Sequence, residues 1–497
     1  MTVGGPGWTG ADLFSDGADR LKQRAAVGAS LSLLARGCRV ASQIATFVIL
    51  ARLLSPEDFG LVGMLLPFIA IVSVAGDLGM STATLQSARM TPGQASALFY
   101  LNMASGVVLA AGFAMAAPLL AGLFAESRVV AIGLALSLVF PLTGLAGQHQ
   151  ALLQRSLNFR SLLIADIAAA LGASVLAIGA ALIGWGYWAI VVRVLAQPAV
   201  YAMAVWGLTP WRPGRPDWRA GRMTALRLGG FNLGFSLLTV GGRQLDNILI
   251  GWRWGEAALG PYALAYRLFF TPVQQLSQPL EEVMVPTLSK LRDDPARYRR
   301  GYLGVLRMLA LVGAPPLIAV SVAARDVIVF TVGADWLGAV EILRWLAPIG
   351  AIHVASVSLG WLNLSLERSR RQFLWALITV PIYVAGFVIG LSWGAVGVAQ
   401  GYFAASLLTL APGVVWACRG SPVRPWDFVR ALIPAAVASV VVGGTAAVTL
   451  GAMDGFPVWL RLIAIGGATL AVMAAGLAVV VDRDLVRSLI RKREAAA

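Results

Sequence analysis

One apolar stretch near the N-terminus, residues 31–60, constrains the fold more than any other part of the sequence. It reads LSLLARGCRVASQIATFVILARLLSPEDFG and is long enough to cross a bilayer as a helix. Two arginines, Arg36 and Arg39, lie well inside it. A guanidinium at the centre of a membrane helix costs about 2.5–3.5 kcal/mol on insertion scales. The stretch therefore predicts a membrane span with one cationic face.

The polar residues of this stretch recur at helical spacing. Ser32, Arg36, Arg39, Gln43 and Thr46 are separated by four, three, four and three residues. This spacing places all five on one side of a helix. We expect lipid to cover the other side and an anionic ligand or a water-filled cavity to lie against the cationic one.

The composition indicates an all-α integral membrane protein. Of 497 residues, 58% are hydrophobic and 13% charged, and the mean hydropathy is +0.77. The net charge of +15 does not indicate nucleic acid, because the basic residues cluster in the loops on one side. The two cysteines, Cys38 and Cys418, imply no disulfide framework. The first residues contain three aspartates and no apolar core, so we expect a cytoplasmic leader and not a signal peptide.

We predict about fourteen transmembrane helices joined by short connections, with no room for a soluble domain. Two parallel, pseudo-symmetric six-helix lobes would surround a central cavity, and two extra helices would follow them. The predicted segments are a leader (1–25), an N-terminal lobe (26–208), a basic cytoplasmic linker (209–227), a C-terminal lobe (228–418), two further helices (419–481) and a cytoplasmic tail (482–497).

Lysine and arginine in the loops set the expected orientation. With the N-terminus inside, the inner segments hold 27 of the 39 basic residues and the outer loops hold 4. This bias predicts that both termini are cytoplasmic and that the number of spans is even.

A short pattern recurs 200 residues further along the chain. ILARLLSPEDFGLVG around Gly60 aligns with LIGWRWGEAALGPYA around Gly260. At the same offset the first polar face matches Asn232, Ser236, Thr239, Arg243 and Asp246. Six predicted spans separate the copies, so the copies run parallel, an arrangement that recurs in transporters.

The predicted eighth span carries a second polar stripe. Arg267, Thr271, Gln274, Gln278 and Glu281 follow the same four-three-four-three spacing, and three prolines interrupt the helix. We interpret Arg36, Arg39, Arg243 and Arg267 as an anion-binding chamber, because guanidinium groups bind phosphate oxygens with paired hydrogen bonds. The alternative is structural pairing, for example of Arg243 with Asp246.

Three acidic residues in the spans are candidates for coupling to a proton or cation. They are Asp77, Asp246 and Glu281, and Asp166 and Arg193 are weaker candidates of the same kind. A purely structural role as the partner of an arginine is the alternative, above all for Asp246. His149 and His353 stand alone and are expected to pack, not to bind metal. No P-loop is present, so no nucleotide and no other cofactor is expected.

The string LARLLSPEDFG, followed by a second span that ends in DLGMSTATLQ, resembles a known family. It is similar to the polysaccharide transporter branch of the multidrug/oligosaccharidyl-lipid/polysaccharide flippase superfamily, which includes the Wzx-like flippases and the colanic-acid and xanthan types. The similarity extends from about Leu31 to Trp416. In related lipid II flippases, arginines on the first, second and eighth helices hold a pyrophosphate. Arg36, Arg39 and Arg267 match in helix and face, whereas the second span here has Asp77 and no arginine.

The resemblance implies a flippase that moves an undecaprenyl-pyrophosphate-linked oligosaccharide across the cytoplasmic membrane by alternating access. The glycan would lie among Gln43, Asn232, Gln274, Gln275 and Gln278. A polymerase and a chain-length regulator of the same pathway are candidate partners, besides membrane lipid. The alternatives are a membrane glycan polymerase or ligase that uses the same lipid-linked donor, and a cation-coupled drug exporter of the same superfamily. The outer loops are too short for a polymerase, and an exporter would need an acidic cavity.

Overall fold

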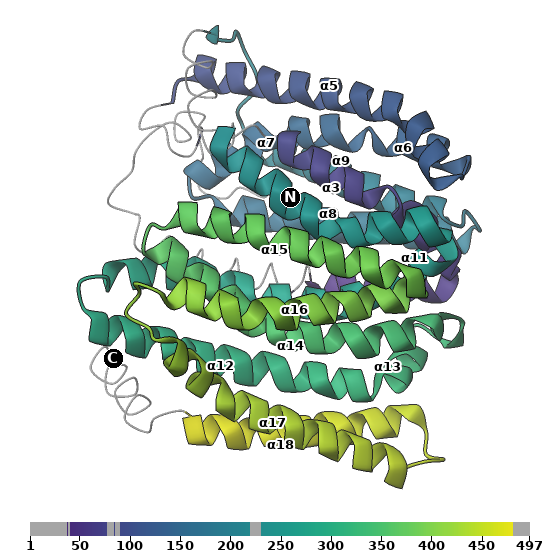
Figure 1. The fold of residues 1–497 in the computed structure, drawn as a ribbon. Coiled ribbons are helices and arrows are strands. Elements are labelled where there is room, and N and C mark those ends of the chain that lie inside the picture. Colours follow the sequence, from purple (N-terminus) through teal and green to yellow (C-terminus); the bar gives the residue numbers. More distant parts are fainter. Residues whose placement is uncertain (1–36, 38–39, 77–83, 85–89, 219–229, 481–497) are drawn as a thin grey trace, which may run out of the picture. The chain divides into compact units, whose positions relative to one another are not determined.

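A computed structural model of the protein describes residues 37, 40–76, 84, 90–218 and 230–480. Within these ranges every regular element is a helix (Figure 1), as the composition predicts. Several sequence predictions lie outside the described residues, namely Arg36, Arg39, Asp77, the leader 1–25, the tail 482–497 and the side chain of Asn232.

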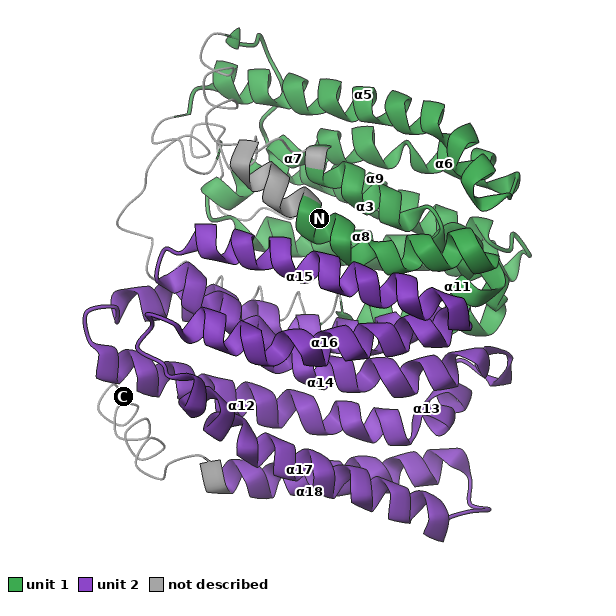
Figure 2. Cartoon of the chain, viewed as in Figure 1, with its two compact units in different colours: residues 1–260 green, residues 261–497 purple. Residues whose placement is uncertain are grey.

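The chain divides into two compact units, residues 1–260 and residues 261–497 (Figure 2). Unit 1 contains a helix over Val40–Leu53, α2 (Pro56–Gly63), α3 (Leu66–Gly76), α5 (Pro92–Phe124), α6 (Arg128–Leu136), α7 (Val139–Arg155), α8 (Phe159–Leu182), α9 (Trp188–Leu208) and the first part of α11 (Gly230–Lys290). Unit 2 contains the rest of α11, α12 (Pro295–Val322), α13 (Ala324–Thr331), η3 (Ala334–Trp336), α14 (Gly338–Ser365), α15 (Ser369–Gly390), η4 (Leu391–Trp393), α16 (Gly394–Cys418), α17 (Pro425–Ala452) and α18 (Val458–Val480). The six-helix lobes expected from the sequence stay a prediction.

Capping residues explain where the first helices begin. The Ser55 hydroxyl accepts a hydrogen bond from the Asp58 backbone N–H at 3.2 Å, and the Asp58 carboxylate accepts one from the Ser55 N–H at 3.1 Å. Pro56 occupies the start of α2. Thr91 and Gln94 make the same reciprocal pair at the start of α5. These capping boxes satisfy backbone donors that a helix start leaves open, so SPED ends one helix and begins the next.

The element α11 joins two helices that the sequence predicts as separate spans. Its backbone leaves helical geometry at Gly255, where φ is 75° and ψ is −170°. Only glycine adopts such a conformation readily, which explains why the chain turns at this position. Four prolines, Pro261, Pro272, Pro279 and Pro286, follow in the second helix.

Ten helices of the described residues are long and apolar enough to cross a membrane, and Val40–Leu53 is a shorter apolar helix. The protein is therefore a multi-pass membrane protein. One of the ten candidates, Ser369–Cys418, includes both α15 and α16, and α11 with its polar residues is not among them. The predicted number of fourteen spans stays a prediction.

The two copies of the sequence repeat meet in a reciprocal close contact within unit 1. A Cβ added to Gly60 would lie 1.9 Å from the carbonyl oxygen of Glu256. A Cβ added to Gly260 would lie 1.9 Å from the carbonyl oxygen of Pro56. Gly60 aligns with Gly260 in the repeat, and Pro56 aligns with Glu256, so each copy makes the same contact with the other. Only glycine permits this backbone approach.

Unit 2 is built on α12, which packs against α14, α17 and α18, while α15 packs along α16. The buried hydroxyls of Tyr298 and Tyr302 lie 2.7 Å from Ser365 Oγ and 2.9 Å from Ser358 Oγ, respectively. An ion pair of 3.0 Å between Arg461 and Asp326 ties α18 to α13. Polar groups inside this unit are thus used to fix the positions of its helices.

Candidate functional site

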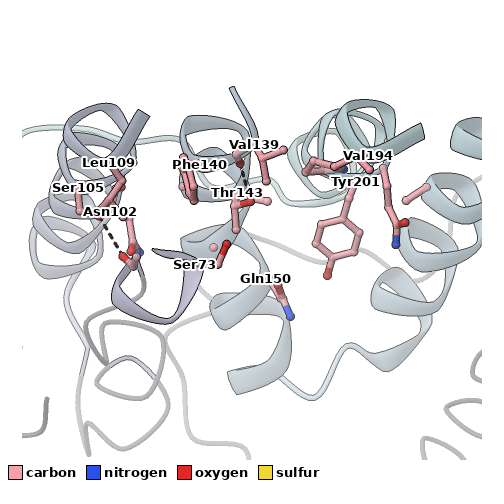
Figure 3. Close-up of a pocket in the computed structure, with 18 of the residues that line it drawn as sticks. Ser73, Asn102, Ser105, Leu109, Val139, Phe140, Thr143, Gln150, Val194 and Tyr201 are labelled. Carbon is pink, nitrogen blue, oxygen red and sulfur yellow. Dashed lines mark hydrogen bonds between the residues drawn. The ribbon is translucent and has the colours of Figure 1, made fainter. Parts of the chain in front are cut away.

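Unit 1 contains a cavity of about 580 Å³, lined by both apolar and polar side chains (Figure 3). The cavity is lined by one face of each of five helices, α3, α5, α7, α8 and α9. Its volume lies within the roughly 300–1,000 Å³ that small-molecule sites occupy. Figure 3 shows Asn102 of α5, Gln150 of α7 and Tyr201 of α9 among the residues that line it.

The face of α9 supplies a cation to this cavity. Arg193, Gln197 and Tyr201 follow each other at intervals of four residues and all line it. This spacing stacks side chains on one side of a helix. Pro198 lies on the same wall and has no N–H, so the carbonyl of Val194 lacks its usual helical donor. The wall therefore offers a cation, an amide, a phenol and a backbone acceptor.

Two glycines that line the cavity let α5 and α7 approach closely. A Cβ on Gly106 would lie 2.8 Å from the carbonyl oxygen of Phe140, and one on Gly144 would lie 2.9 Å from that of Asn102. Close backbone approach at small residues is typical of membrane helix pairs. Asn102 is 5% exposed, and its side-chain Nδ2 has no hydrogen-bond partner in the described residues.

The sequence singles out Asp166 and Arg193 only as weaker candidates, and the structure brings both to this cavity. Neither belongs to the two polar stripes on which the predicted chamber rests. The helical spacing of Arg193, Gln197 and Tyr201 is the signal that could have found the cavity from the sequence.

In unit 1 the structure describes three of the main predicted site residues. Gln43 is half-buried, Arg243 is exposed and Asp246 is fully buried. The Asp246 carboxylate accepts hydrogen bonds from the Asn247 N–H at 2.7 Å and the Asn247 side-chain amide at 3.0 Å. The structural pairing that competes with the chamber stays a prediction, because Asp246 has further interactions besides those with Asn247.

Thr46 departs from the polar face expected for the first span. It is buried, and its hydroxyl donates a hydrogen bond of 2.6 Å to Ser174 Oγ on α8. Ser42 Oγ lies 3.3 Å from the same Ser174 hydroxyl. The end of the predicted face therefore packs inside unit 1 instead of facing a cavity.

In unit 2 the second stripe lies on the less buried side of α11. Arg267, Gln274, Gln275 and Glu281 are half-buried and Gln278 is exposed. The opposite side carries the buried Phe269, Val273, Ser277, Met284 and Leu288. Residues on the stripe are thus not used to fill the core of unit 2.

The two histidines pack as predicted. His149 is fully buried and stacks on Trp206 with ring centroids 4.5 Å apart. His353 lies 5.9 Å from the ring of Phe270. Among the described residues no group of His, Cys, Asp or Glu could hold a metal ion.

A charged cluster joins the end of α5 to the Gly255 turn. Arg128 Nη2 lies 2.8 Å from Glu126 and 2.8 Å from Glu256. The side-chain hydrogen bond from Arg128, together with its backbone N–H, lowers the pKa of Glu126 from 4.5 to about 2.

This cluster makes the stability of unit 1 depend on pH. Because the folded pKa of Glu126 is lowered, its stabilisation is full above about 4.5 and is lost as the pH falls toward about 2. We expect the melting temperature of the Arg128→Gln variant to lie slightly below wild type at neutral pH, because exposed ion pairs contribute little. Melting curves should show this difference shrinking below pH about 4.5. If the difference in melting temperature between wild type and Arg128→Gln grows on acidification, Arg128 is not the cause of the lowered Glu126 pKa.

The described residues form a helical, multi-pass membrane protein with a cavity among the helices of unit 1. Residues 49–341 match the family model described as polysaccharide biosynthesis protein. The chain belongs to this family, and the resemblance seen in LARLLSPEDFG is confirmed.

Curated relatives support this placement. The chain is 30% identical over 361 residues to the teichuronic acid biosynthesis protein TuaB of Bacillus subtilis (strain 168), covering 70% of this chain and 72% of the relative. It is 22% identical to the lipopolysaccharide biosynthesis protein WzxC of Escherichia coli (strain K12), covering 78% and 80%. It is 25% identical to the succinoglycan biosynthesis transport protein ExoT of Rhizobium meliloti (strain 1021), covering 70% of each chain.

Solved structures show the same fold at low sequence identity. The lipid II flippase MurJ in an inward closed conformation matches with a TM-score of 0.65 and 14% identity, over 93% of this chain and 99% of MurJ. An inward-facing MATE family transporter of the MOP superfamily matches with a TM-score of 0.61 and 12% identity, over 79% and 96%. The predicted all-α transporter architecture is thereby confirmed.

Proposed function

We propose that the protein is a flippase for undecaprenyl-pyrophosphate-linked oligosaccharide repeat units. One observation carries the proposal: a member of a polysaccharide biosynthesis family has ten helices in its described residues that are long and apolar enough to cross a membrane. Such a helical bundle can carry a lipid-linked intermediate across the bilayer. The relative named as a succinoglycan transport protein supports this reading.

We propose further that the arginines of the polar stripes bind the pyrophosphate. Arg36, Arg39, Arg243 and Arg267 are the cations expected on these faces, and several are needed because the group carries more than one negative charge. Gln43, Asn232, Gln274, Gln275 and Gln278 would bind the sugars. The exposed position of Arg243 and the less buried side that carries Arg267 support this proposal.

The transport cycle would be alternating access driven by the membrane potential or an ion gradient. Asp77, Asp246 and Glu281 are the proposed coupling residues. The bias of 27 to 4 basic residues supports a location in the bacterial cytoplasmic membrane with both termini in the cytoplasm. A polymerase and a chain-length regulator would then act on the product at the outer face.

Reconstitution tests this function directly. Purified full-length protein is placed in liposomes with undecaprenyl-pyrophosphate-linked oligosaccharide that carries a fluorophore on the sugar. We expect a membrane-impermeant quencher to reach the inner-leaflet pool in these liposomes and not in protein-free ones. A fluorescent phosphatidylcholine serves as the leakage control and should stay protected. Elongated lipid-linked products without any flipping would instead identify a polymerase.

A further inference from the structure

The cavity of unit 1 holds a guanidinium that has no ion-pair partner among the described residues. Arg193 lines this cavity and makes no ion pair or hydrogen bond with any residue in the described part of the chain. Asp166 lines the same cavity, but it is engaged in an interaction of its own. A guanidinium within a membrane span is costly, so an unpaired one indicates a place where an anion binds.

Further polar groups line the cavity that holds this guanidinium. The Asn102 amide nitrogen is buried and has no hydrogen-bond partner in the described residues. Gln197 lies one turn from Arg193 on α9, and Gln150 lines the wall formed by α7. The Val194 carbonyl lacks its helical donor because Pro198 follows four residues later. A buried polar group left unpaired is destabilising, and a ligand with matching donors and acceptors would remove this penalty.

The single arginine that lines the cavity among the described residues distinguishes between two kinds of anion, a pyrophosphate and a carboxylate. A pyrophosphate requires several cations, whereas a single guanidinium matches one carboxylate with two parallel hydrogen bonds. Amide groups and the ring of Tyr201 supply what the hydroxyls and the apolar face of a pyranose need. The cavity therefore fits a sugar that carries one carboxylate better than it fits a neutral sugar or a pyrophosphate.

We infer that the cavity of unit 1 binds an acidic sugar of the transported glycan, with Arg193 on its carboxylate and Asn102, Gln150 and Gln197 on its hydroxyls. This inference rests on the proposed function and adds a substrate class to it. It assigns the selection of acidic glycans to residues other than the proposed pyrophosphate arginines. The protein would then prefer repeat units that contain a uronic acid or a similarly carboxylated residue.

Binding of two matched probes tests the inference. Methyl glucuronide and methyl glucoside differ only in carboxylate against hydroxymethyl, and saturation-transfer NMR reports their binding to the full-length protein in nanodiscs. We expect wild type to bind the glucuronide roughly tenfold more tightly, as one charge-assisted hydrogen bond allows. Arg193→Gln should reduce the glucuronide affinity to that of the glucoside. The control Arg253→Gln, at an exposed arginine stacked on Trp254, should keep the preference.

A second variant guards against misfolding of Arg193→Gln. Arg193→Lys keeps the positive charge and loses the paired hydrogen-bond donors of the guanidinium. We expect this variant to retain part of the preference for glucuronide that Arg193→Gln loses. Equal binding of both probes by wild type, or an unchanged preference in Arg193→Gln, would overturn the inference.

Flipping assays separate this inference from the proposed function. Wild-type liposomes receive lipid-linked oligosaccharides that contain either glucuronate or glucose at the same position. If both substrates are flipped at the same rate, the acidic-sugar inference is wrong and the flippase proposal holds. If neither is flipped, the flippase proposal fails, and the binding measurement alone decides whether the cavity prefers an acidic sugar. Faster flipping of the glucuronate substrate, abolished by Arg193→Gln, supports both.

Discussion

Arg39→Ala and Arg267→Ala should each lower the rate of flipping by roughly ten- to a hundredfold, because a lost hydrogen bond to a charged group costs about 1.5–3 kcal/mol. The loss is large because pyrophosphate would remain partly unneutralised inside a membrane protein. Membrane insertion should stay normal, since neither side chain is needed to form an apolar helix. Flipping in liposomes and protein level in the membrane are the two measurements.

Charge and geometry can be separated at these positions. Arg→Lys keeps the charge but loses the two-pronged hydrogen-bonding geometry, so we expect only partial recovery. Arg253→Ala is the matched control, because Arg253 is exposed and stacks on Trp254 with 5.1 Å between its Cζ and the ring centroid. Normal flipping in alanine variants of all four arginines, Arg36, Arg39, Arg243 and Arg267, would refute the pyrophosphate site and return them to a structural role.

Gly60→Ala and Gly260→Ala should each prevent unit 1 from reaching its native packing. The added Cβ would lie 1.9 Å from a backbone carbonyl oxygen in both cases, and a backbone atom cannot rotate away as a side chain can. Overpacking commonly lowers the free energy of unfolding by about 1–3 kcal/mol. A clash between a Cβ and a backbone atom at this distance should lower it by more. Size-exclusion profiles and thermal melting of the detergent-solubilised protein should show loss of the folded species.

Two other glycines provide a control for the change of residue type. A Cβ at Gly112 or Gly122 of α5 would meet no atom within 4 Å. Alanine at these positions should leave stability unchanged or raise it slightly, because it favours a helix over glycine by up to about 1 kcal/mol. A normally folded Gly60→Ala protein would show that the two repeat copies do not meet in the way described.

Gly60 and Gly260 also connect the sequence repeat to the fold. The alignment at an offset of 200 pairs Gly60 with Gly260 on similarity alone. The structure shows that each of these glycines packs against the backbone of the other repeat copy, and that the two contacts involve aligned positions. A repeat in which each copy contacts its counterpart is what two related helix groups around an axis would produce.

Much of the fold follows from local properties of the sequence. Long apolar runs give membrane helices because the bilayer leaves a backbone no partner but itself. Ser55 and Thr91 mark the starts of α2 and α5 because their hydroxyls satisfy open N–H groups. The ordered string LARLLSPEDFG indicates the family, and the match over residues 49–341 confirms it. Helical spacing alone also assigns Arg267 and Gln274 to a common face.

Only the tertiary structure decided which of these faces meet. Helical spacing defines a face but not its direction, and packing placed the Thr46 hydroxyl against Ser174 of α8. The cavity around Arg193 gathers residues from Ser73 to Tyr201, whose helices contribute one face each. No local signal in the sequence measures the gap left between five helices, because that gap depends on how closely Gly106 and Gly144 let α5 and α7 approach. The sequence by itself therefore determined the class, the helices and their polar faces, whereas the rotation and separation of the packed helices determined the site.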